Sequence, residues 1–306
     1  MNTSALPTSV RLIDVGPRDG LQNEKQPVPA AVKIELVARL QAAGFKEIEV
    51  TSYVSPKWVP QMADNHEVMA GLARRPDMRY SVLTPNLKGL EAALADRPDE
   101  ILVFGAASEA FSQRNINCSI AESIDRFAPV VAAALAAGVA VRGSMSCAVG
   151  CPYEGEVAPE RVGDLARRMK AIGVQRLDVA DTIGVGTPLK VQRALAATLA
   201  HFAPDAVNGH FHDTYGQALP NTLAALQMGI WNFQSSVAGL GGCPYARGAT
   251  GNVASEDLVY MLHGMGIDTG IDLEALVDAG VFISQALGRP SASRVARALL
   301  ARREAA

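Results

Sequence analysis

The 306-residue sequence has little of several features that mark particular classes of protein. Its four cysteines, Cys118, Cys147, Cys151 and Cys243, are too few for a disulfide scaffold and favour a reducing compartment. It has no long basic run, and its formal net charge is −3, so nucleic acid is not an expected partner. The longest apolar stretch, residues 127–141, is too short to span a bilayer, which takes about 20 such residues.

The sequence does contain enough apolar material for a large folded domain. Hydrophobic residues make up 49% of the chain, and a chain of this length can remove roughly 75% of its unfolded surface from water. Residues 1–10 match neither a secretion signal nor an arginine-rich transit helix. We therefore expect a folded cytoplasmic protein that has no membrane partner and needs no structural metal.

Short β-branched segments alternate with longer segments rich in alanine and leucine. The expected strands are Arg11–Val15, Glu47–Ser52, Tyr80–Thr84, Ile101–Ala106, Val139–Cys147, Arg176–Asp181, Ala206–His212 and Asn232–Ala238. The helices expected after them are Ala30–Ala43, Asn65–Ala73, Leu87–Ala95, Ile120–Ala137, Pro159–Ile172, Pro188–His201, Ala218–Met228 and Glu256–His263. Eight such units predict an α/β fold of the (β/α)₈ TIM-barrel type.

The alternative to a closed barrel is an open doubly wound sheet. Such sheets usually carry a glycine-rich phosphate fingerprint after the first strand, whereas residues 16–20 here are Gly-Pro-Arg-Asp-Gly. No linker rich in glycine, serine or proline divides the chain. We therefore expect one catalytic domain over residues 1–306, with the barrel at about 9–265 and helices at about 272–303, namely Leu273–Leu287 and Ser291–Arg302.

Polar residues gather where the expected strands end, which is where TIM-barrel enzymes place their active sites. His210 and His212 are two apart on one strand, so alternation turns both imidazoles to the same face. Alone, this pattern slightly favours two half-buried histidines, but Asp19 at the end of the first strand makes a metal site the better interpretation. Nitrogen and oxygen ligands suit Mg²⁺, Mn²⁺ or Zn²⁺, and the scarcity of thiolates favours Mg²⁺ or Mn²⁺.

Arg18 and Asp19 form a charged pair in the short loop after the first strand. The pair could be a surface ion pair, or Asp19 could bind the metal while Arg18 faces an oxyanion, a task that suits its rigid fork of donors. Glu49 lies in an otherwise apolar strand, so its carboxylate needs a partner. Arg18 or a metal-bound water is the expected one.

The segment 239–252 holds five glycines and matches neither a Rossmann nor a P-loop pattern. It could be a flexible connector, but in a barrel it better fits a mobile lid that delivers Cys243 to the site. Cys147 and Cys151 have no second cysteine pair to complete a zinc site, so we expect them to be packing residues.

Four segments resemble one enzyme family. They are Val15–Lys25 (VGPRDGLQNEK), Ser52–Met62 (SYVSPKWVPQM), Phe104–Glu109 (FGAASE) and Ser236–Tyr245 (SVAGLGGCPY). These segments are similar to those of 3-hydroxy-3-methylglutaryl-CoA lyases, and the similarity spans roughly residues 9–300. The wider group contains metal-dependent TIM-barrel lyases and Claisen-type synthases.

The resemblance implies a substrate class and a set of residue roles. It implies an acyl-CoA substrate cleaved by a retro-Claisen step, a divalent metal (Mg²⁺ or Mn²⁺) and a homodimer. Arg18 would stabilise the enolate, Cys243 would protonate its carbon, and either Asp19 or His210 would be the general base. The implied metal ligands are Asp19, His210, His212 and Asn252, with Glu49 and Asp181 as supporting carboxylates. The implied substrate-binding positions are Arg18, Gln22, Lys25, Asn115, Ser144, Asp178 and Thr182.

Two places depart from the family pattern. Ser144 stands where tyrosine is usual, and Asp178 and Ala180 stand where serine and glycine are usual. We expect both to face the acyl part of the substrate, where an added carboxylate would repel a substrate carboxylate. A lyase for citramalyl-CoA is therefore the main alternative. A Claisen-type synthase and a non-catalytic binding protein are less favoured, because the Cys243 loop and the retained polar set both indicate a lyase.

Overall fold

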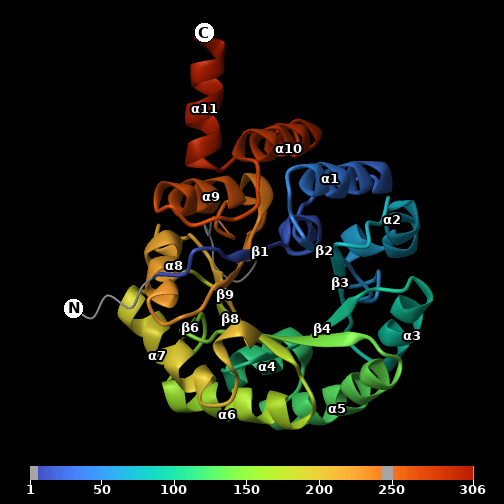
Figure 1. Ribbon diagram of the computed structural model, residues 1–306. Coiled ribbons are helices and arrows are strands. Elements are labelled where there is room, and N and C mark those ends of the chain that lie inside the picture. The colour runs from blue at the N-terminus through green and yellow to red at the C-terminus, as the bar shows by residue number, and fades with distance from the viewer. Residues whose placement is uncertain (1–5, 243–250, 306) are drawn as a thin grey trace.

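Eight parallel strands close into a barrel in the computed structural model, which describes residues 6–242 and 251–305. Viewed along the barrel axis, the helices form a ring around the strands (Figure 1). The strands are β1 (Arg11–Asp14), β2 (Glu47–Ser52), β3 (Arg79–Leu83), β4 (Glu100–Ala106), β5 (Ala140–Ser146), β8 (Arg176–Asp181), β9 (Val207–Phe211) and β10 (Asn232–Ser235). β1 pairs with both β2 and β10, so the predicted closure is confirmed.

Most helices lie where the sequence predicts them. They are α1 (Ala30–Ala42), α2 (Asn65–Gly71), α3 (Leu87–Ala95), α5 (Ile120–Ala136), α6 (Pro159–Ala171), α7 (Pro188–Leu199), α8 (Ala218–Leu226), α9 (Ser255–Gly264), α10 (Leu273–Ala286) and α11 (Arg294–Glu304). Local signals set their ends. Ser119 and Glu122 form a capping box at the start of α5, and Gly44 follows α1 with a φ of 110°, which favours glycine.

Three local elements differ from the prediction. The helix α4 (Glu109–Ile116) was missed because few of its residues are apolar; Ser108 caps it by accepting a hydrogen bond from the Phe111 N–H. A short hairpin, β6 (Gly150–Cys151) with β7 (Gly155–Glu156), follows β5. The predicted last strand is too long: β10 ends at Ser235, and a 3₁₀ turn, η4 (Val237–Gly239), follows it.

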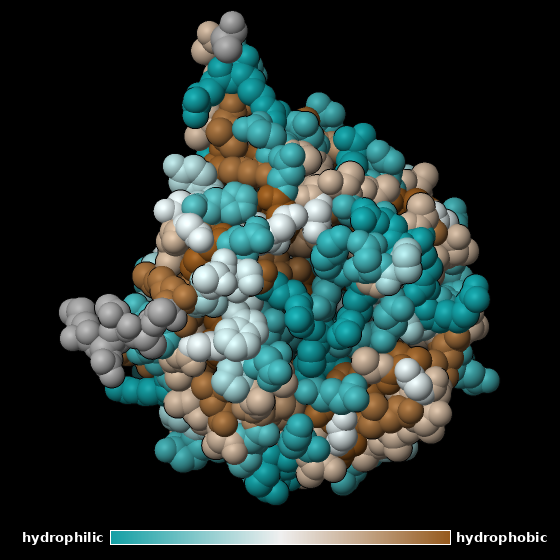
Figure 2. All heavy atoms as spheres, viewed as in Figure 1, coloured by the Kyte–Doolittle hydropathy of each residue, from teal (hydrophilic) through white to brown (hydrophobic). Residues whose placement is uncertain are grey.

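The apolar core lies between the outer face of the barrel and the helices that surround it, with buried residues such as Leu36, Val50, Val131, Leu195 and Leu258. α11 projects from the body of the molecule and carries the C-terminus at its tip (Figure 1). Figure 2 shows the face at the amino ends of the barrel strands, with hydrophilic side chains over its middle. No helix in the described part of the chain is long and apolar enough to cross a membrane.

Candidate active site

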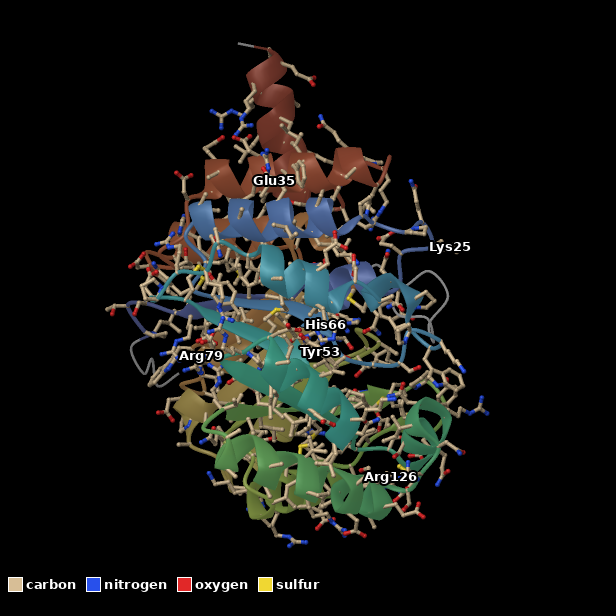
Figure 3. The ribbon with its side chains drawn as sticks, turned by 90° about the vertical axis from the view of Figure 1, so that its right-hand side faces the viewer. Lys25, Glu35, Tyr53, His66, Arg79 and Arg126 are labelled. Carbon is tan, nitrogen blue, oxygen red and sulfur yellow. The ribbon has the colours of Figure 1, made fainter. Side chains whose placement is uncertain are left out.

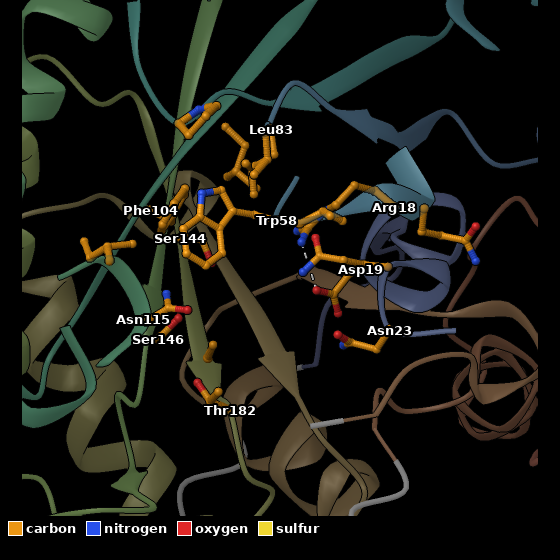
Figure 4. A pocket seen from close by; sticks show the side chains of 18 of the residues that line it. Arg18, Asp19, Asn23, Trp58, Leu83, Phe104, Asn115, Ser144, Ser146 and Thr182 are labelled. Atoms are coloured by element: carbon orange, nitrogen blue, oxygen red, sulfur yellow. Dashed lines mark hydrogen bonds and ion pairs between the residues drawn. The ribbon is translucent and has the colours of Figure 1, made fainter. Parts of the chain in front are cut away.

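A cavity of about 880 Å³ opens at the carboxyl ends of the barrel strands (Figure 4). Its wall is formed by the loops and strand ends of most of the β/α units, as expected for a barrel enzyme. Many of the residues proposed from the sequence line it. They are Arg18, Asp19, Gln22, Lys25, Asn115, Ser144, Thr182, His210 and His212.

The predicted grouping of one carboxylate and two imidazoles is present in the structure. One ligand atom of each of Asp19, His210 and His212 lies within 4.8 Å of the other two. The two histidine rings have their centroids 5.2 Å apart, as expected for positions i and i+2 along β9 and its end. Asp19 comes from η1 (Gly16–Gly20), a single π-helical turn that follows β1. The chain thus brings the three side chains together from two non-adjacent strand ends.

Burial and neighbouring charges leave the ligand atoms of Asp19 and His212 free of protons. Burial would raise the pKa of Asp19, but the positive charge of Arg18 and the neighbouring imidazoles outweigh it and lower this pKa to about 2. Burial, together with His210, lowers the pKa of His212 to about 3. At neutral pH Asp19 is therefore a carboxylate and His212 a neutral imidazole, which are the forms that bind metal ions.

Hydrogen bonds around the group also fit a divalent cation. Gln234 Oε1 lies 2.6 Å from His210 Nδ1, which places a proton on that nitrogen and leaves Nε2 to bind. The buried Nδ1 of His212 has no hydrogen-bond partner in the described chain. Asn252, which pairs with His212 in an isolated β-bridge, donates from Nδ2 to Asp19 Oδ2 at 2.8 Å. These residues fit a bound metal ion.

Sequence reasoning missed Gln234. It lies directly opposite His210 in the register of β9 and β10, where its buried amide supports the imidazole. The signal was a polar residue inside the expected strand Asn232–Ala238, one strand away from the two histidines.

Arg18 joins the metal-binding group to the interior of the barrel. Its Nη1 lies 3.0 Å from Asp19 Oδ1, and its Nε and Nη2 contact the buried carboxylate of Glu49. Figure 4 shows Arg18 and Asp19 side by side at one wall of the cavity. Glu49 thus has the Arg18 partner that its place in an apolar strand predicts.

Arg142 is the centre of a buried ion network that the sequence did not reveal. The Arg142 side chain is 0% exposed and contacts Glu49 at 2.6 Å, Glu100 at 3.0 Å and Asp178 at 2.7 Å. Burial alone would lower its pKa, but the three carboxylates raise it above the usual value. The available signal was the same as for Glu49, a charged residue in the middle of an apolar strand.

The position of Asp178 corrects a prediction. We expected its carboxylate to face the acyl part of the substrate, but Asp178 does not line the cavity. Its Oδ2 binds Arg142, and its Oδ1 accepts a 2.6 Å hydrogen bond from Asn208. The charge is therefore neutralised inside the barrel, and Asp178 does not repel a substrate carboxylate in the cavity. Ser144, by contrast, does line the cavity.

Asp181 supports a loop and does not line the cavity. Its two carboxylate oxygens accept hydrogen bonds from the N–H groups of Val185 (3.1 Å) and Gly186 (2.8 Å), in the loop after β8. Burial raises its pKa to about 6, although these hydrogen bonds act in the opposite direction. Thr182, the next residue, accepts from the Cys147 N–H at 2.7 Å and thereby links this loop to the end of β5.

A second buried carboxyl, Asp14, fastens together the two segments that carry Asp19 and Asn252. Its Oδ1 accepts from Gly16 N at 2.8 Å, and its Oδ2 accepts from Val237 N at 2.9 Å and Ser255 Oγ at 2.8 Å. Glu256 supports the same turn by accepting from the Ala238 N–H. Burial raises the pKa of Asp14 to about 7 and that of Glu256 to about 8.

The cysteines fall into two groups. Cys147 and Cys151 are buried and form no disulfide with a described residue. Cys243, the proposed acid, and the glycine-rich loop around it lie mostly outside the described residues. The roles predicted for Cys243 and for a mobile lid therefore stay predictions.

Comparison with known proteins places this geometry in a family. The HMGL-like family model matches residues 9–283, which is most of the chain. The chain belongs to the HMGL-like family. The matched residues span the whole barrel and include the segments that carry Arg18 and both histidines.

Individual HMGL-like relatives agree in sequence and in fold. The "3-hydroxy-3-isohexenylglutaryl-CoA/hydroxy-methylglutaryl-CoA lyase" of Pseudomonas aeruginosa is 58% identical over 297 residues, covering 97% of this chain and 99% of that protein. A crystal structure of hydroxymethylglutaryl-CoA lyase from P. aeruginosa superposes with a TM-score of 0.95 at 57% identity, covering 97% and 99% of the two chains. An HMG-CoA lyase from Acinetobacter baumannii, solved with coenzyme A and 3-methylmalate, gives 0.92 at 36% identity, covering 96% of each chain.

Proposed function

We propose that this protein cleaves 3-hydroxy-3-methylglutaryl-CoA to acetoacetate and acetyl-CoA. The observation that carries the proposal is the Asp19/His210/His212 group beside Arg18, at the inner end of a cavity. Nearly full-length similarity to proteins with this named activity supports the choice of substrate. It also supports assigning the enzyme to the carbon–carbon lyases.

The proposed reaction is a retro-Claisen cleavage. The 3-hydroxyl loses its proton, the bond between carbons two and three breaks, and the electron pair moves into the thioester as an enolate. Mg²⁺ or Mn²⁺ held by Asp19, His210 and His212, with Asn252 beside them, would supply a Lewis acid for the oxygens. Protonation of carbon two then releases acetyl-CoA, and carbon three becomes the ketone of acetoacetate.

The side chains around the cavity have distinct proposed roles. Arg18 stabilises the enolate oxygen, because its guanidinium is charged, rigid and fixed by Glu49. Asp19 or His210 accepts the hydroxyl proton, directly or through water. Cys243 is the proposed donor of the proton to carbon two. Gln22, Lys25, Asn115, Ser144 and Thr182 are the proposed positions that contact the substrate.

A second substrate is favoured by the apolar part of the cavity wall. Leu83, Leu102, Phe104, Phe111 and Phe127 line it, whereas the methyl group on carbon three of the first substrate needs only a small apolar contact. The Phe104 and Phe127 rings meet edge to face with centroids 5.2 Å apart. We propose that a 3-hydroxy-3-isohexenylglutaryl-CoA ester, named for the P. aeruginosa relative, is also cleaved.

The test is a comparison of three thioesters with identification of the products. We expect cleavage of 3-hydroxy-3-methylglutaryl-CoA and of its 3-isohexenyl homologue, and much slower cleavage of citramalyl-CoA. Preference for citramalyl-CoA would show that the specific assignment is wrong within the right family. Acetyl-CoA-dependent thiol release with a 2-oxo acid, without thioester cleavage, would instead indicate a synthase. Arg18→Met is the control that should lose the cleavage activity.

We also propose that the protein is a homodimer, on the strength of the family resemblance. Light scattering at micromolar protein should give twice the chain mass, and a monomer mass would contradict the proposal.

A further inference from the structure

The base of α11 contacts the segments that carry the proposed metal ligands. Figure 1 and Figure 3 show, from two directions, that most of α11 projects away from the barrel. Residues 289–294, here called the clasp, lead from α10 into the first residue of α11. Ser293 of the clasp is 0% exposed and caps α11 by accepting a hydrogen bond from the Ala296 N–H at 2.9 Å. The clasp is thus a packed part of the molecule, although the helix that follows it is largely exposed.

The backbone of the clasp is fixed by a buried carboxylate of α9. Asp257 Oδ1 accepts hydrogen bonds from Ser293 Oγ at 2.6 Å and from the Val295 N–H at 2.9 Å, and its Oδ2 accepts from the Arg294 N–H at 3.3 Å. Asp257 is itself only 7% exposed, so these bonds are sheltered from water. The first turn of α11 therefore holds one place against α9, and the Arg294 side chain starts from a fixed point.

Arg294 reaches the segment that carries His212. Its Nη1 lies 3.1 Å from Oδ2 of Asp213, the residue that directly follows His212. The Asp213 N–H donates at 2.9 Å to the carbonyl of Gly251, the residue that directly precedes Asn252. Asp213 therefore lies between two of the proposed metal ligands, and Arg294 anchors it from the C-terminal extension.

Arg289 reaches the segment that carries Asp19. Its Nη2 forms an ion pair with the carboxylate of Glu24, which lies in the loop after η1. The Glu24 N–H donates to the Leu21 carbonyl at 2.9 Å, one residue beyond the end of η1. Arg289 thus ties the clasp to the turn that presents Asp19.

A backbone hydrogen bond ties the clasp to the turn next to Asn252. The Ala292 N–H donates to the Ala238 carbonyl in η4 at 3.0 Å. Leu240 directly follows η4, and its carbonyl accepts a 3.2 Å hydrogen bond from Asn252 Nδ2. Six consecutive residues therefore contact each of the separate segments that bring Asp19, His212 and Asn252 together.

We propose that the clasp sets the spacing of the metal-binding group, with Arg289 and Arg294 as positioning residues. This inference rests on the proposed function, because it concerns the metal that the function requires. A divalent cation binds tightly only where its ligands are held at suitable distances, and the residues around those ligands hold them there. Neither arginine is among the described residues that line the cavity. Their loss should therefore fall on the affinity for the metal.

The binding test titrates the full chain with Mn²⁺, followed by electron paramagnetic resonance. Arg289→Gln and Arg294→Gln should each raise the Kd for Mn²⁺ by about 2- to 10-fold. That is less than the roughly 10- to 100-fold lost with a residue that touches a ligand, because these ion pairs are partly exposed. The double variant should show about the product of the two effects. Arg294→Lys, which keeps the charge, should recover part of the affinity.

A matched control lies on the same helix. Arg303 pairs with Asp278 and Glu274 of α10, so Arg303→Gln should leave the Kd for Mn²⁺ unchanged. Urea unfolding of each variant checks that it is folded under the conditions of the titration. An unchanged Kd in the folded double variant, or an equal rise in Arg303→Gln, would overturn the inference.

Cleavage of 3-hydroxy-3-methylglutaryl-CoA separates this inference from the proposed function. The double variant should cleave slowly at limiting Mn²⁺ and at the normal rate with excess Mn²⁺, because only metal binding is weakened. A parent protein that binds Mn²⁺ and cleaves the thioester, with a double variant that behaves identically, would refute the clasp alone. Weakened Mn²⁺ binding in the variants of a parent that cleaves no thioester would support the clasp and refute the proposed function. A parent that binds no Mn²⁺ would refute both.

Discussion

The side chain of Arg142 allows a direct test of how the interior of the barrel is stabilised. In Arg142→Met three buried carboxylates lose a shared partner. Glu49 keeps Arg18 and Glu100 keeps Arg176, but among the described residues Asp178 keeps only the amide of Asn208. Removing one side of a buried ion pair typically costs about 3–5 kcal/mol, because the remaining charge stays in a poorly solvated place. We expect a loss of that order in the free energy of unfolding at pH 7.

A second substitution separates charge from packing. In Arg142→Met/Asp178→Asn the carboxylate left with only an amide partner becomes neutral, and we expect about 1–3 kcal/mol of the loss to return. Urea unfolding followed by circular dichroism measures both values. The control is Arg39→Met, whose exposed pair with Glu35 should contribute under about 1 kcal/mol. A loss in Arg142→Met no larger than in the control, or no recovery in the double variant, would refute the reasoning.

Three other outcomes follow from the site. Burial of Asp14 and Glu256 raises their folded-state pKa values to about 7 and 8. Their contribution to the free energy of unfolding therefore falls as the pH rises from about 5 to 8. The double variant Asp14→Asn/Glu256→Gln should flatten this fall when unfolding in urea is measured across that pH range. Chelation of the metal should abolish thioester cleavage, and added Mg²⁺ or Mn²⁺ should restore it. The His212→Ala variant should bind Mn²⁺ more weakly when binding is measured by electron paramagnetic resonance. Full activity of the metal-free protein would contradict the predicted need for a metal. Cys243→Ser should lower kcat by roughly 10²–10⁴-fold with little change in KM, and near-normal turnover would exclude the thiol as the acid.

The barrel and much of its site could be predicted because local patterns decide them. The alternation of β-branched and alanine-rich segments defines the eight units, and strand alternation alone puts His210 and His212 on one face. Residues whose roles depend on cross-strand neighbours could not be predicted. Arg142 and Asp178 meet only because β5 and β8 pair in one particular register, with Ser144 opposite Asp178. A single sequence does not contain that register, so Asp178 was predicted to be a substrate contact and Arg142 was not recognised.

The charged interior of the barrel restricts how the enzyme can change during evolution or in the laboratory. Glu49, Arg142, Asp178 and Glu100 share their partners, so a single substitution among them leaves a buried charge and must be accompanied by another. The apolar wall formed by Leu83, Phe104 and Phe127 carries no such requirement. Variants with new acyl preferences should therefore arise first in that wall and at Ser144. Changes to the strand interior should arise as coupled pairs.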